Sequence, residues 1–369
     1  MKKMVLYIFG FLVVLGLGVI LFVNLSPAFG GNLSQEQKEA YKHFSNYIDG
    51  RFVNEVYADT ARYPSGNLEV ASDSVRRPSG RIPVSEIDWT KINSAEDSLT
   101  WFGHSAFLLS IDNKKLLLDP MLSSSASPVS FVKIKRFSDD MLPLIDQMPP
   151  VDAVFITHDH YDHLDYQSIV KLKNKTAHFF VPLGVSAHLL RWGVPAEKIT
   201  ELNWWQETEY EGLTIALTPS RHFSGRKIST HNSTLWGGWV IIGQNTRLYT
   251  SGDGSYAGHF QEIGKKYGPF AIALIEGAQY DKRWPNSHMT PEQAVQANID
   301  VNGQKMMLIH WGAFSLASHG WTDPIERALK EAQKKHVDLI APKIGETVFI
   351  NTESGIKELW WKQIPGNKE

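Results

Sequence analysis

The residues with the clearest chemical potential form one histidine-rich stretch, Thr157-His158-Asp159-His160-Tyr161-Asp162-His163-Leu164-Asp165. The run at residues 151–157 predicts a buried strand that leads into it. Alternate positions at a strand exit project to one side, so His158 and His160 can bind one cation. Asp162 and His163 lie just past the bend and can bind a second. Imidazole nitrogen with carboxylate oxygen favours Zn²⁺ over Mg²⁺ or Ca²⁺. A polar surface loop is the alternative, and the preceding buried strand argues against it.

At these positions the chain resembles the metallo-β-lactamase superfamily, whose H-x-H-x-D-H motif matches residues 158–163 throughout. The resemblance implies an αβ/βα sandwich with a two-metal site at one edge, formed by loops at strand ends. It also implies three further ligands downstream, and the candidates that follow predicted strands are His222, Asp253 and His310. The ligands expected for the first zinc are His158, His160 and His222. Those expected for the second are Asp162, His163 and His310, with Asp253 as the bridge.

Most of the chain beyond the N-terminus is similar to a subgroup that includes N-acylphosphatidylethanolamine-hydrolysing phospholipase D and its bacterial relatives. The matching stretches are residues 49–54, 101–105, 118–120, 157–165, 221–224, 235–236, 251–253, 288–292 and 310–312. The Gly-His-Ser and Asp-Pro pieces among them are shared by many hydrolases of the superfamily, including sugar-phosphate lactonases. The stretches around residues 288 and 310 are more specific, and they imply a phospholipid substrate.

Three further side chains have possible roles beside the metals. His104, in a Gly-His-Ser turn, either orients a ligand carboxylate or serves only the turn. His288 precedes a predicted helix and either contacts a substrate phosphate or is structural. Asp119, beside Pro120, is either a partner of a metal ligand or a turn residue. The remaining histidines have no informative spacing and are expected in packing or at the surface; they are His43, His178, His188, His231, His259, His319 and His336.

Regular alternation of elements begins near residue 99 and predicts an α/β layered domain. Strands are predicted at residues 99–111, 115–118, 151–157, 179–181, 213–217, 235–242, 247–250, 271–275, 306–309 and 337–340. The pair Asp112-Asn113 predicts a turn between the first two. A short helix is expected at residues 167–172, another from the capping box of Thr290, and a third from Asp323.

The N-terminus carries Lys2 and Lys3 and then an uninterrupted apolar run at residues 4–23. As a helix this run is about 30 Å long, which matches the hydrocarbon core of a bilayer. We expect an uncleaved single-pass anchor, with the lysines in the cytoplasm and the rest of the chain outside. A signal peptide cleaved near Ser26-Pro27-Ala28 is the alternative.

The expected organisation therefore has three parts. Residues 1–28 form the cytoplasmic tail and anchor, or the signal peptide. Residues 29–98 form a linker, a helix from the capping box of Ser34 to about Tyr47, and an extended lead-in. Residues 99–369 form the hydrolase domain.

Composition restricts the possible functions. Hydrophobic residues make up 43% and charged residues 21%, which is ordinary for a globular protein. The formal net charge of −2 gives no basic footprint for nucleic acid. Cysteine is absent, so any zinc must be held by carboxylates and by some of the 14 histidines.

These observations predict a hydrolase in which two zinc ions bridge a hydroxide and no protein nucleophile is needed. A phosphodiesterase acting on N-acylphosphatidylethanolamine or a related phospholipid is favoured. The second hypothesis is another hydrolase of the superfamily, such as a lactonase or small-molecule esterase. The third is a non-enzymatic scaffold, against which the complete ligand set argues. A redox di-iron role is disfavoured because His160 stands where such relatives carry glutamate.

Overall fold

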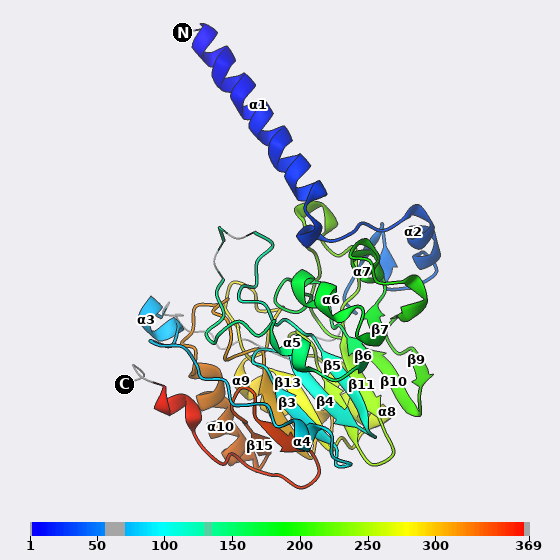
Figure 1. Cartoon of the computed structure of the whole chain (residues 1–369), viewed down its shortest axis with the longest axis vertical. Helices are drawn as coiled ribbons and strands as arrows, with labels where there is room; N and C mark the ends of the chain where they lie inside the picture. Colours follow the sequence, from blue (N-terminus) through cyan, green and yellow to red (C-terminus); the bar gives the residue numbers. More distant parts are fainter. Residues whose placement is uncertain (1, 56–70, 130, 133, 365–369) are drawn as a thin grey trace.

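The computed structural model describes residues 2–55, 71–129, 131–132 and 134–364 (Figure 1). The part of the predicted lead-in at residues 56–70 therefore lies outside the described residues. The domain contains two mixed seven-stranded sheets and surrounding helices, which confirms the predicted α/β sandwich. A further helix, α1 (Lys2–Leu25), projects away from it.

The first sheet has the order β16-β3-β4-β5-β6-β7-β8. Its strands are β3 (Ser98–Trp101), β4 (Phe107–Ile111), β5 (Lys114–Leu118), β6 (Val151–Phe155), β7 (Thr176–Pro182), β8 (Ile199–Leu202) and β16 (Thr347–Phe349). From β5 to β8 the neighbours are parallel, whereas β16, β3, β4 and β5 pair antiparallel. The carboxyl ends of β3, β5 and β6 therefore lie at the same edge of the sheet.

The second sheet has the order β15-β14-β13-β12-β11-β10-β9. Its strands are β9 (Glu207–Tyr210), β10 (Leu213–Thr218), β11 (Gly238–Ile242), β12 (Arg247–Thr250), β13 (Ile272–Glu276), β14 (Lys305–Ile309) and β15 (Asp338–Ile340). Pairing is antiparallel from β9 to β12 and parallel from β12 to β15. In this sheet β10, β12, β13 and β14 share one carboxyl edge.

Helices and short elements complete the domain. The α-helices are α2 (Gln35–Tyr41), α3 (Asp73–Arg76), α4 (Trp89–Ile92), α5 (Leu144–Gln147), α6 (Tyr166–Leu172), α7 (Ser186–Arg191), α8 (His259–Tyr267), α9 (Pro291–Asp300) and α10 (Asp323–Lys335). The 3-10 helices are η1 (Pro27–Phe29), η2 (Ala196–Lys198), η3 (Ile228–Thr230) and η4 (Trp360–Gln363), and β1 (Tyr47–Ile48) pairs with β2 (Arg51–Phe52). Helix α9 packs on β13 and β14 and against α8 and α10.

The core is rich in aromatic side chains. Trp101, Trp311 and Trp360 lie close together, with ring centroids 5.3–6.3 Å apart, and all three are buried. Phe155 contacts both Phe180 in its own sheet and Trp239 in the opposite sheet. These rings hold the two sheets in a fixed relation.

Among the predicted elements whose bounds differ in the structure, three differ for reasons that the contacts show. The strand expected at residues 99–111 is interrupted after Trp101, because Gly103 and His104 have φ angles of +83° and +58° and form a turn. The strand expected at residues 235–242 begins only at Gly238, since the residues before it bond to loops of the first sheet. The helix capped by Ser34 ends at Tyr41, because the chain then forms the β1–β2 hairpin.

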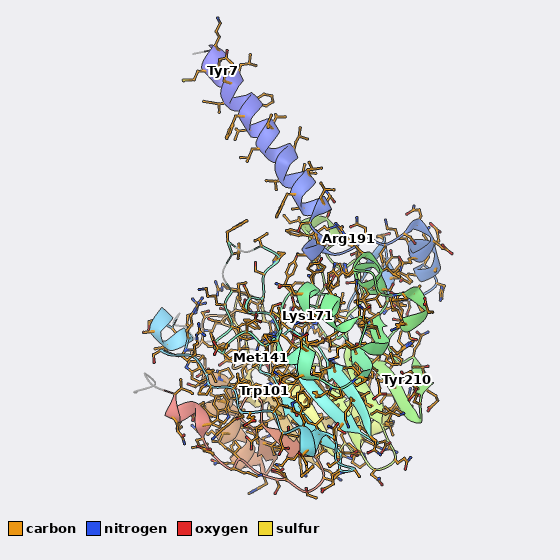
Figure 2. The ribbon with its side chains drawn as sticks, viewed as in Figure 1. Tyr7, Trp101, Met141, Lys171, Arg191 and Tyr210 are labelled. Carbon is orange, nitrogen blue, oxygen red and sulfur yellow. The ribbon has the colours of Figure 1, made fainter. Side chains whose placement is uncertain are left out.

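Helix α1 is long and apolar enough to cross a bilayer, a property that a signal sequence shares. Within residues 3–25, an 18-residue stretch has a mean hydropathy of 2.8, and none of that stretch is buried. The segment that follows, residues 26–31, does not run free to the domain. Arg191, at the lower end of α1 in Figure 2, donates hydrogen bonds to the carbonyl groups of Asn24, before this segment, and of Gly30, within it. Gly30 and Gly31 are buried. The part predicted as a linker is thus packed against α7.

Candidate metal centre

The structure brings all seven predicted ligands together at the carboxyl edges of the two sheets. His158, His160, Asp162 and His163 follow β6, which belongs to the first sheet. The three downstream candidates follow strands β10, β12 and β14 of the second sheet and are His222, Asp253 and His310. Because β10, β12 and β14 run in the same direction, the three downstream candidates reach the same edge of the second sheet.

The two sheets are joined directly at this point. An isolated bridge pairs His104, in the turn between β3 and β4, with Trp311, which follows β14. His104 N donates to Trp311 O over 2.8 Å, and His310 N donates to His104 O over 3.1 Å. His104 and His310 both have positive φ angles, +58° and +70°, which are unfavourable for residues other than glycine. The bridge holds both residues in these strained conformations.

The candidate ligands fall into two adjoining groups. The first is a cluster of imidazoles, in which His160 Nδ1 lies 2.9 Å from His158 Nε2 and 3.3 Å from His222 Nε2. In the second, Asp162 Oδ2 lies 3.1 Å from His310 Nε2 and 3.6 Å from His163 Nε2. Within each group the donor atoms lie within 4.8 Å of one another, so each could hold one metal ion.

Asp253 lies between the two groups. Its Oδ2 atom is 3.2 Å from both His163 Nε2 and His310 Nε2, and 3.8 Å from His158 Nε2. The carboxylate therefore approaches imidazoles of both groups at once. This is the position from which one side chain could bridge two cations.

Buried atoms in the centre have unmet bonding capacity that a cation would satisfy. Asp253 Oδ1 and His163 Nε2 are buried, and neither has a hydrogen bond of acceptable geometry among the described residues. A buried polar atom without a partner costs about 1–3 kcal/mol. Neutral imidazoles and carboxylates are also the donor set that zinc prefers. The residues present thus fit a metal centre.

Second partners orient several of the ligands. Asp119, directly after β5, has its Oδ2 atom 2.8 Å from His163 Nδ1, while its Oδ1 atom accepts a hydrogen bond from Thr157 N. His222 Nδ1 lies 2.9 Å from Ser287 O. These contacts occupy the outer nitrogen of each ring and leave Nε2 facing the centre. The sequence allowed Asp119 to be either a partner of a metal ligand or a turn residue. In the structure it contacts the candidate ligand His163, and it also has a positive φ of +38°.

His104 and His288 both border the cluster. His104 is buried, and its Nε2 atom lies 2.8 Å from Asp162 Oδ2. The ring of His288 lies 5.2 Å from that of His222 and stacks at 5.1 Å on that of His310. Its side chain is 12% exposed, so His288 lies at the rim and can be reached from outside.

The sequence-based prediction missed Glu276, which is fully buried at the end of β13. Its Oε1 atom lies 3.3 Å from His288 Nδ1 and 3.7 Å from His310 Nδ1, and Oε2 accepts a hydrogen bond from Met289 N. The available signal was an acidic residue directly after the apolar run 271–275. The predicted strand ends at Ile275, one residue short of Glu276, whereas β13 includes that residue.

Electrostatics keep the carboxylates of the centre ionised. Burial alone would raise the pKa of Asp162, but His163 with the hydrogen bonds of His104 and His310 lowers that pKa well below its usual value. Burial would also raise the pKa of Asp253. The nearby His163 and His310 outweigh burial and lower that pKa well below its usual value. Conversely, burial would lower the pKa of His163, but Asp253, Asp162 and Asp119 raise that pKa well above normal. The carboxylates thus favour a positive charge beside them, and a divalent cation could supply that charge in place of the proton on His163.

The other histidines lie away from this cluster. His188 Nε2 is 3.1 Å from Asp159 Oδ2, and His178 Nε2 is 2.8 Å from Thr200 Oγ1. His319 Nε2 accepts a hydrogen bond from Gln279 N. In the described part of the chain, the potential metal-ligand groups include none of His43, His178, His188, His231, His259, His319 and His336.

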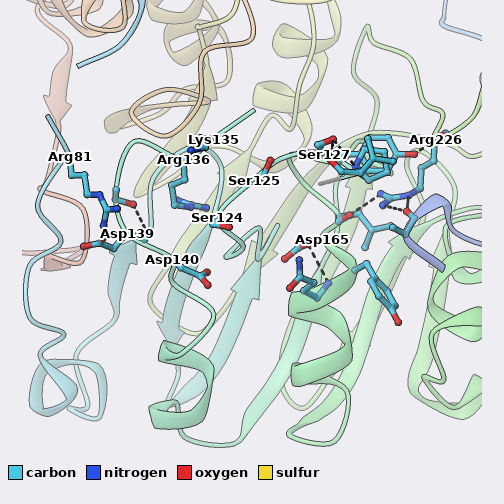
Figure 3. Close-up of a pocket in the computed structure, with 18 residues that line it drawn as sticks. Arg81, Ser124, Ser125, Ser127, Lys135, Arg136, Asp139, Asp140, Asp165 and Arg226 are labelled. Carbon is cyan, nitrogen blue, oxygen red and sulfur yellow. Dashed lines mark hydrogen bonds and ion pairs between the residues drawn. The ribbon is translucent and has the colours of Figure 1, made fainter. Parts of the chain in front are cut away.

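Two hollows flank the loop that carries the first four ligands. A cleft of about 810 Å³ is lined by Ser124, Arg136, Asp165 and Arg226 among others (Figure 3). A shallower groove of about 570 Å³ is lined by Arg51, residues 223–228 and His231. Its residue nearest the centre is Phe223, whose ring lies 4.6 Å from that of His160 and 4.7 Å from that of His222.

Comparison with known proteins yields matches over most of the chain. Residues 114–311 match the family model described as the beta-lactamase superfamily domain. An uncharacterized protein of Mycobacterium tuberculosis is 41% identical over 329 residues, covering 86% of this chain and 87% of the relative. The N-acyl-phosphatidylethanolamine-hydrolyzing phospholipase D 1 of Caenorhabditis elegans is 33% identical over 71% of this chain and 74% of its own length. A solved metallo hydrolase of the archaeon Ignicoccus hospitalis aligns with a TM-score of 0.50 at 26% identity, over 68% of this chain and 97% of that one.

Proposed function

The chain belongs to the metallo-β-lactamase superfamily as a metal-dependent hydrolase, and from this premise we propose that it is a zinc-dependent phosphodiesterase of phospholipids. The proposed substrate is N-acylphosphatidylethanolamine or a close relative. The proposed bond is the one on the headgroup side of phosphorus, so that phosphatidate is released. Similarity to the phospholipase D of Caenorhabditis elegans supports this class over other hydrolytic reactions of the superfamily.

In this proposal two zinc ions occupy the centre. The ligands of the first would be His158, His160 and His222, those of the second Asp162, His163 and His310, and Asp253 would bind both. The division follows the two groups of donor atoms, with the carboxylate of Asp253 between them. When bound, such a zinc pair supplies an activated water at neutral pH and stabilises negative charge that develops on phosphoryl oxygens.

The side chains around the ligands would set their orientation. Asp119 holds His163 through Nδ1, and His104 contacts the Asp162 carboxylate. His288 would contact the substrate phosphate from the rim of the centre. The Glu276 carboxylate beside its Nδ1 favours a proton on that nitrogen and fixes the direction in which the ring points.

The observation that carries the choice of substrate is the groove beside the centre. Its lining contains the cationic side chains of the exposed Arg51 and the half-buried Lys227, the apolar side chains Phe223 and Ile228, and no carboxylate. A phosphate group with an apolar chain attached would find both kinds of partner there. Small lactones or neutral esters would use the apolar residues alone and leave the cations without an anionic partner.

We also propose that α1 is a retained anchor, with Lys2 and Lys3 in the cytoplasm and the hydrolase domain outside. A reporter fused to the C-terminus should then be active only outside the cytoplasm. Activity in the cytoplasm would reverse this orientation. A mature chain beginning near residue 29 would identify the segment as a cleaved signal.

The substrate is tested with the purified full chain in mixed micelles of detergent and N-acylphosphatidylethanolamine, with products identified by mass spectrometry. We expect phosphatidate together with N-acylethanolamine. His288→Ala should slow this reaction while the zinc content per chain stays unchanged. Free fatty acid without phosphatidate, or hydrolysis only of a lactone panel, would reject the phosphodiesterase and favour the lactonase or esterase alternative.

A further inference from the structure

The junction between α1 and the domain is held by side chains that bind its backbone. Arg191 Nη1 donates to Gly30 O over 2.8 Å, and Nη2 donates to the carbonyl groups of Asn24 and Leu25 over 2.7 and 2.9 Å. Trp192 Nε1 donates to Pro27 O over 2.8 Å. The last turn of α1 and the segment after it are therefore bonded to the same end of α7.

A second arginine connects this segment to the metal-binding loop. The buried Arg226 donates to Ala28 O over 2.7 Å, while its other terminal nitrogen donates to the carbonyl groups of Asp159 and Leu164 over 2.7 and 2.8 Å. Figure 3 shows its guanidinium group at one end of the large cleft. One side chain thus bonds both the junction and the loop that carries the ligands.

Close packing removes the remaining freedom of the junction. A Cβ atom added to Gly31 would lie 1.9 Å from Ala187 O, and one added to Gly30 would lie 2.2 Å from His188 Nδ1. The backbone of these glycines is thus in direct contact with α7. Together with the hydrogen bonds to Asn24, Leu25 and Pro27, this close packing restrains the direction in which α1 leaves the domain.

Because the direction of α1 is restrained, the side of the domain from which α1 projects keeps a constant orientation relative to this helix. Ile228, at the start of η3, is fully exposed, and it lies two residues beyond Arg226, which bonds Ala28. Lys227 Nζ donates to Asn32 Oδ1 over 3.1 Å, which ties the same tip to the junction. An apolar side chain is therefore presented to solvent beside the exit of α1.

A second apolar tip lies on the same side. Phe131 is 77% exposed and Val132 44% exposed, in the loop between β5 and α5. In Figure 1 this blue-green loop rises on the side of the domain from which α1 projects. The large cleft is lined by Ala28 and also by Pro128 and Val129 of this loop, so the loop faces the junction across the cleft.

We propose that the side formed by the exit of α1, the Ile228 tip and the Phe131–Val132 tip rests on the bilayer surface. The two tips would sit among the lipid headgroups, where apolar side chains leave water while nearby cations such as Lys227 and Arg51 meet lipid phosphates. The groove that ends at Ile228 would then open at the membrane surface. This inference requires α1 to remain in the bilayer, but it does not depend on the substrate proposed above.

The test uses the absence of cysteine from the chain, which allows single spin labels to be introduced. The full-length chain carrying Ile228→Cys or Phe131→Cys is labelled with a nitroxide and placed in nanodiscs of phosphatidylethanolamine and phosphatidylglycerol. Matched controls are Ile299→Cys and Leu359→Cys, which replace apolar residues 41% and 36% exposed in α9 and before η4. The relaxation of each nitroxide by oxygen, compared with its relaxation by a water-soluble nickel chelate, measures how deeply the label lies in the bilayer.

We expect the ratio of oxygen to nickel accessibility at positions 228 and 131 to exceed that at 299 and 359 several-fold. Equal ratios at all four positions would overturn the proposal, whatever the enzyme hydrolyses. As a second measurement, Phe131→Asp should lower turnover of a phospholipid in vesicles several-fold and leave hydrolysis of soluble bis(4-nitrophenyl) phosphate unchanged. If no phospholipid is cleaved by the unaltered chain, the proposed function fails, and the label depths alone decide this inference.

Discussion

The metal centre and the junction below α1 are both rigid polar assemblies, yet they are built from different partners. In the centre, several of the orienting contacts join two side chains: Asp119 with His163, His104 with Asp162, and Glu276 with His288. In the junction, the side chains of Arg191, Trp192 and Arg226 bond almost entirely to backbone carbonyl groups. At these contacts the first assembly depends on the residue types at both ends, whereas the second depends mainly on the residue type at one end.

This difference predicts how each region responds to substitution. Replacing either member of a side-chain pair in the centre should disturb ligation, because the donor and the acceptor must match. Some residues contribute only a backbone carbonyl group to the junction. Replacing one of them should change the stability of the junction little, unless the new side chain collides with α7. The junction should therefore be sensitive at its arginines and glycines and tolerant elsewhere.

The largest effect is expected from Asp162→Asn. The amide keeps the size of the carboxylate but loses the charge, so the second metal position should be weakened while the fold persists. Turnover should fall by at least about 10³-fold, which corresponds to about 4 kcal/mol of lost transition-state stabilisation. Metal analysis should find less zinc per chain than in the parent. Asp146→Asn, at an exposed carboxylate paired with Lys171, is the control and should leave both quantities unchanged. Full activity of Asp162→Asn would reject the two-metal site.

A smaller loss is expected from Asp119→Asn. The asparagine can no longer accept two hydrogen bonds from Thr157 while also orienting His163 as a carboxylate does. Removing such an outer partner typically lowers metal affinity or activity about 10–100-fold. Chelator competition on the purified chain measures the affinity. Asp152→Asn is the matched control, because that carboxylate accepts a hydrogen bond from Lys115 N and belongs to no potential ligand group in the described part of the chain. An unchanged zinc affinity for Asp119→Asn would show that this contact is only structural.

In the junction, Gly31→Ala should destabilise through a collision. The added methyl group would meet the carbonyl of Ala187 at 1.9 Å, so the segment or α7 must shift. Overpacking of this kind costs about 1–3 kcal/mol. Thermal unfolding of the full chain should show a lower midpoint than for Gly80→Ala, where a Cβ atom has no neighbour within 4 Å. Equal midpoints would contradict tight packing at the junction.

The smallest effect is expected from Arg191→Ala, because its carbonyl partners can be rehydrated. A net loss of about 1 kcal/mol follows from the modest value of exposed hydrogen bonds. Amide hydrogen exchange at residues 26–31 should speed up, while exchange in α9 stays the same. Arg81→Ala removes another exposed arginine, one that pairs with Asp139, and serves as the control. If exchange in the junction is identical in the two variants, Arg191 does not restrain α1.

The sequence by itself determined much of the chemistry of the centre. His158, His160, Asp162 and His163 lie within a single loop, so their residue types and spacing indicate a metal site without knowledge of the fold. The strands before His222, Asp253 and His310 were predicted from apolar runs, and the structure has strands at those positions. The apolar character of α1 is likewise a property of composition.

Only the tertiary structure decided the partners of these residues and the way the domain meets α1. Glu276 faces His288 and His310 because β13 and β14 are neighbours in a sheet, a relation that has no local signal in the chain. The break between β3 and β4 arises where His104 pairs with Trp311 of the other sheet. The segment predicted as a linker is packed because Arg191 and Arg226 bind its carbonyl groups. Every residue has a carbonyl group, so these contacts are independent of the identity of the residues they hold, and sequence patterns cannot reveal them.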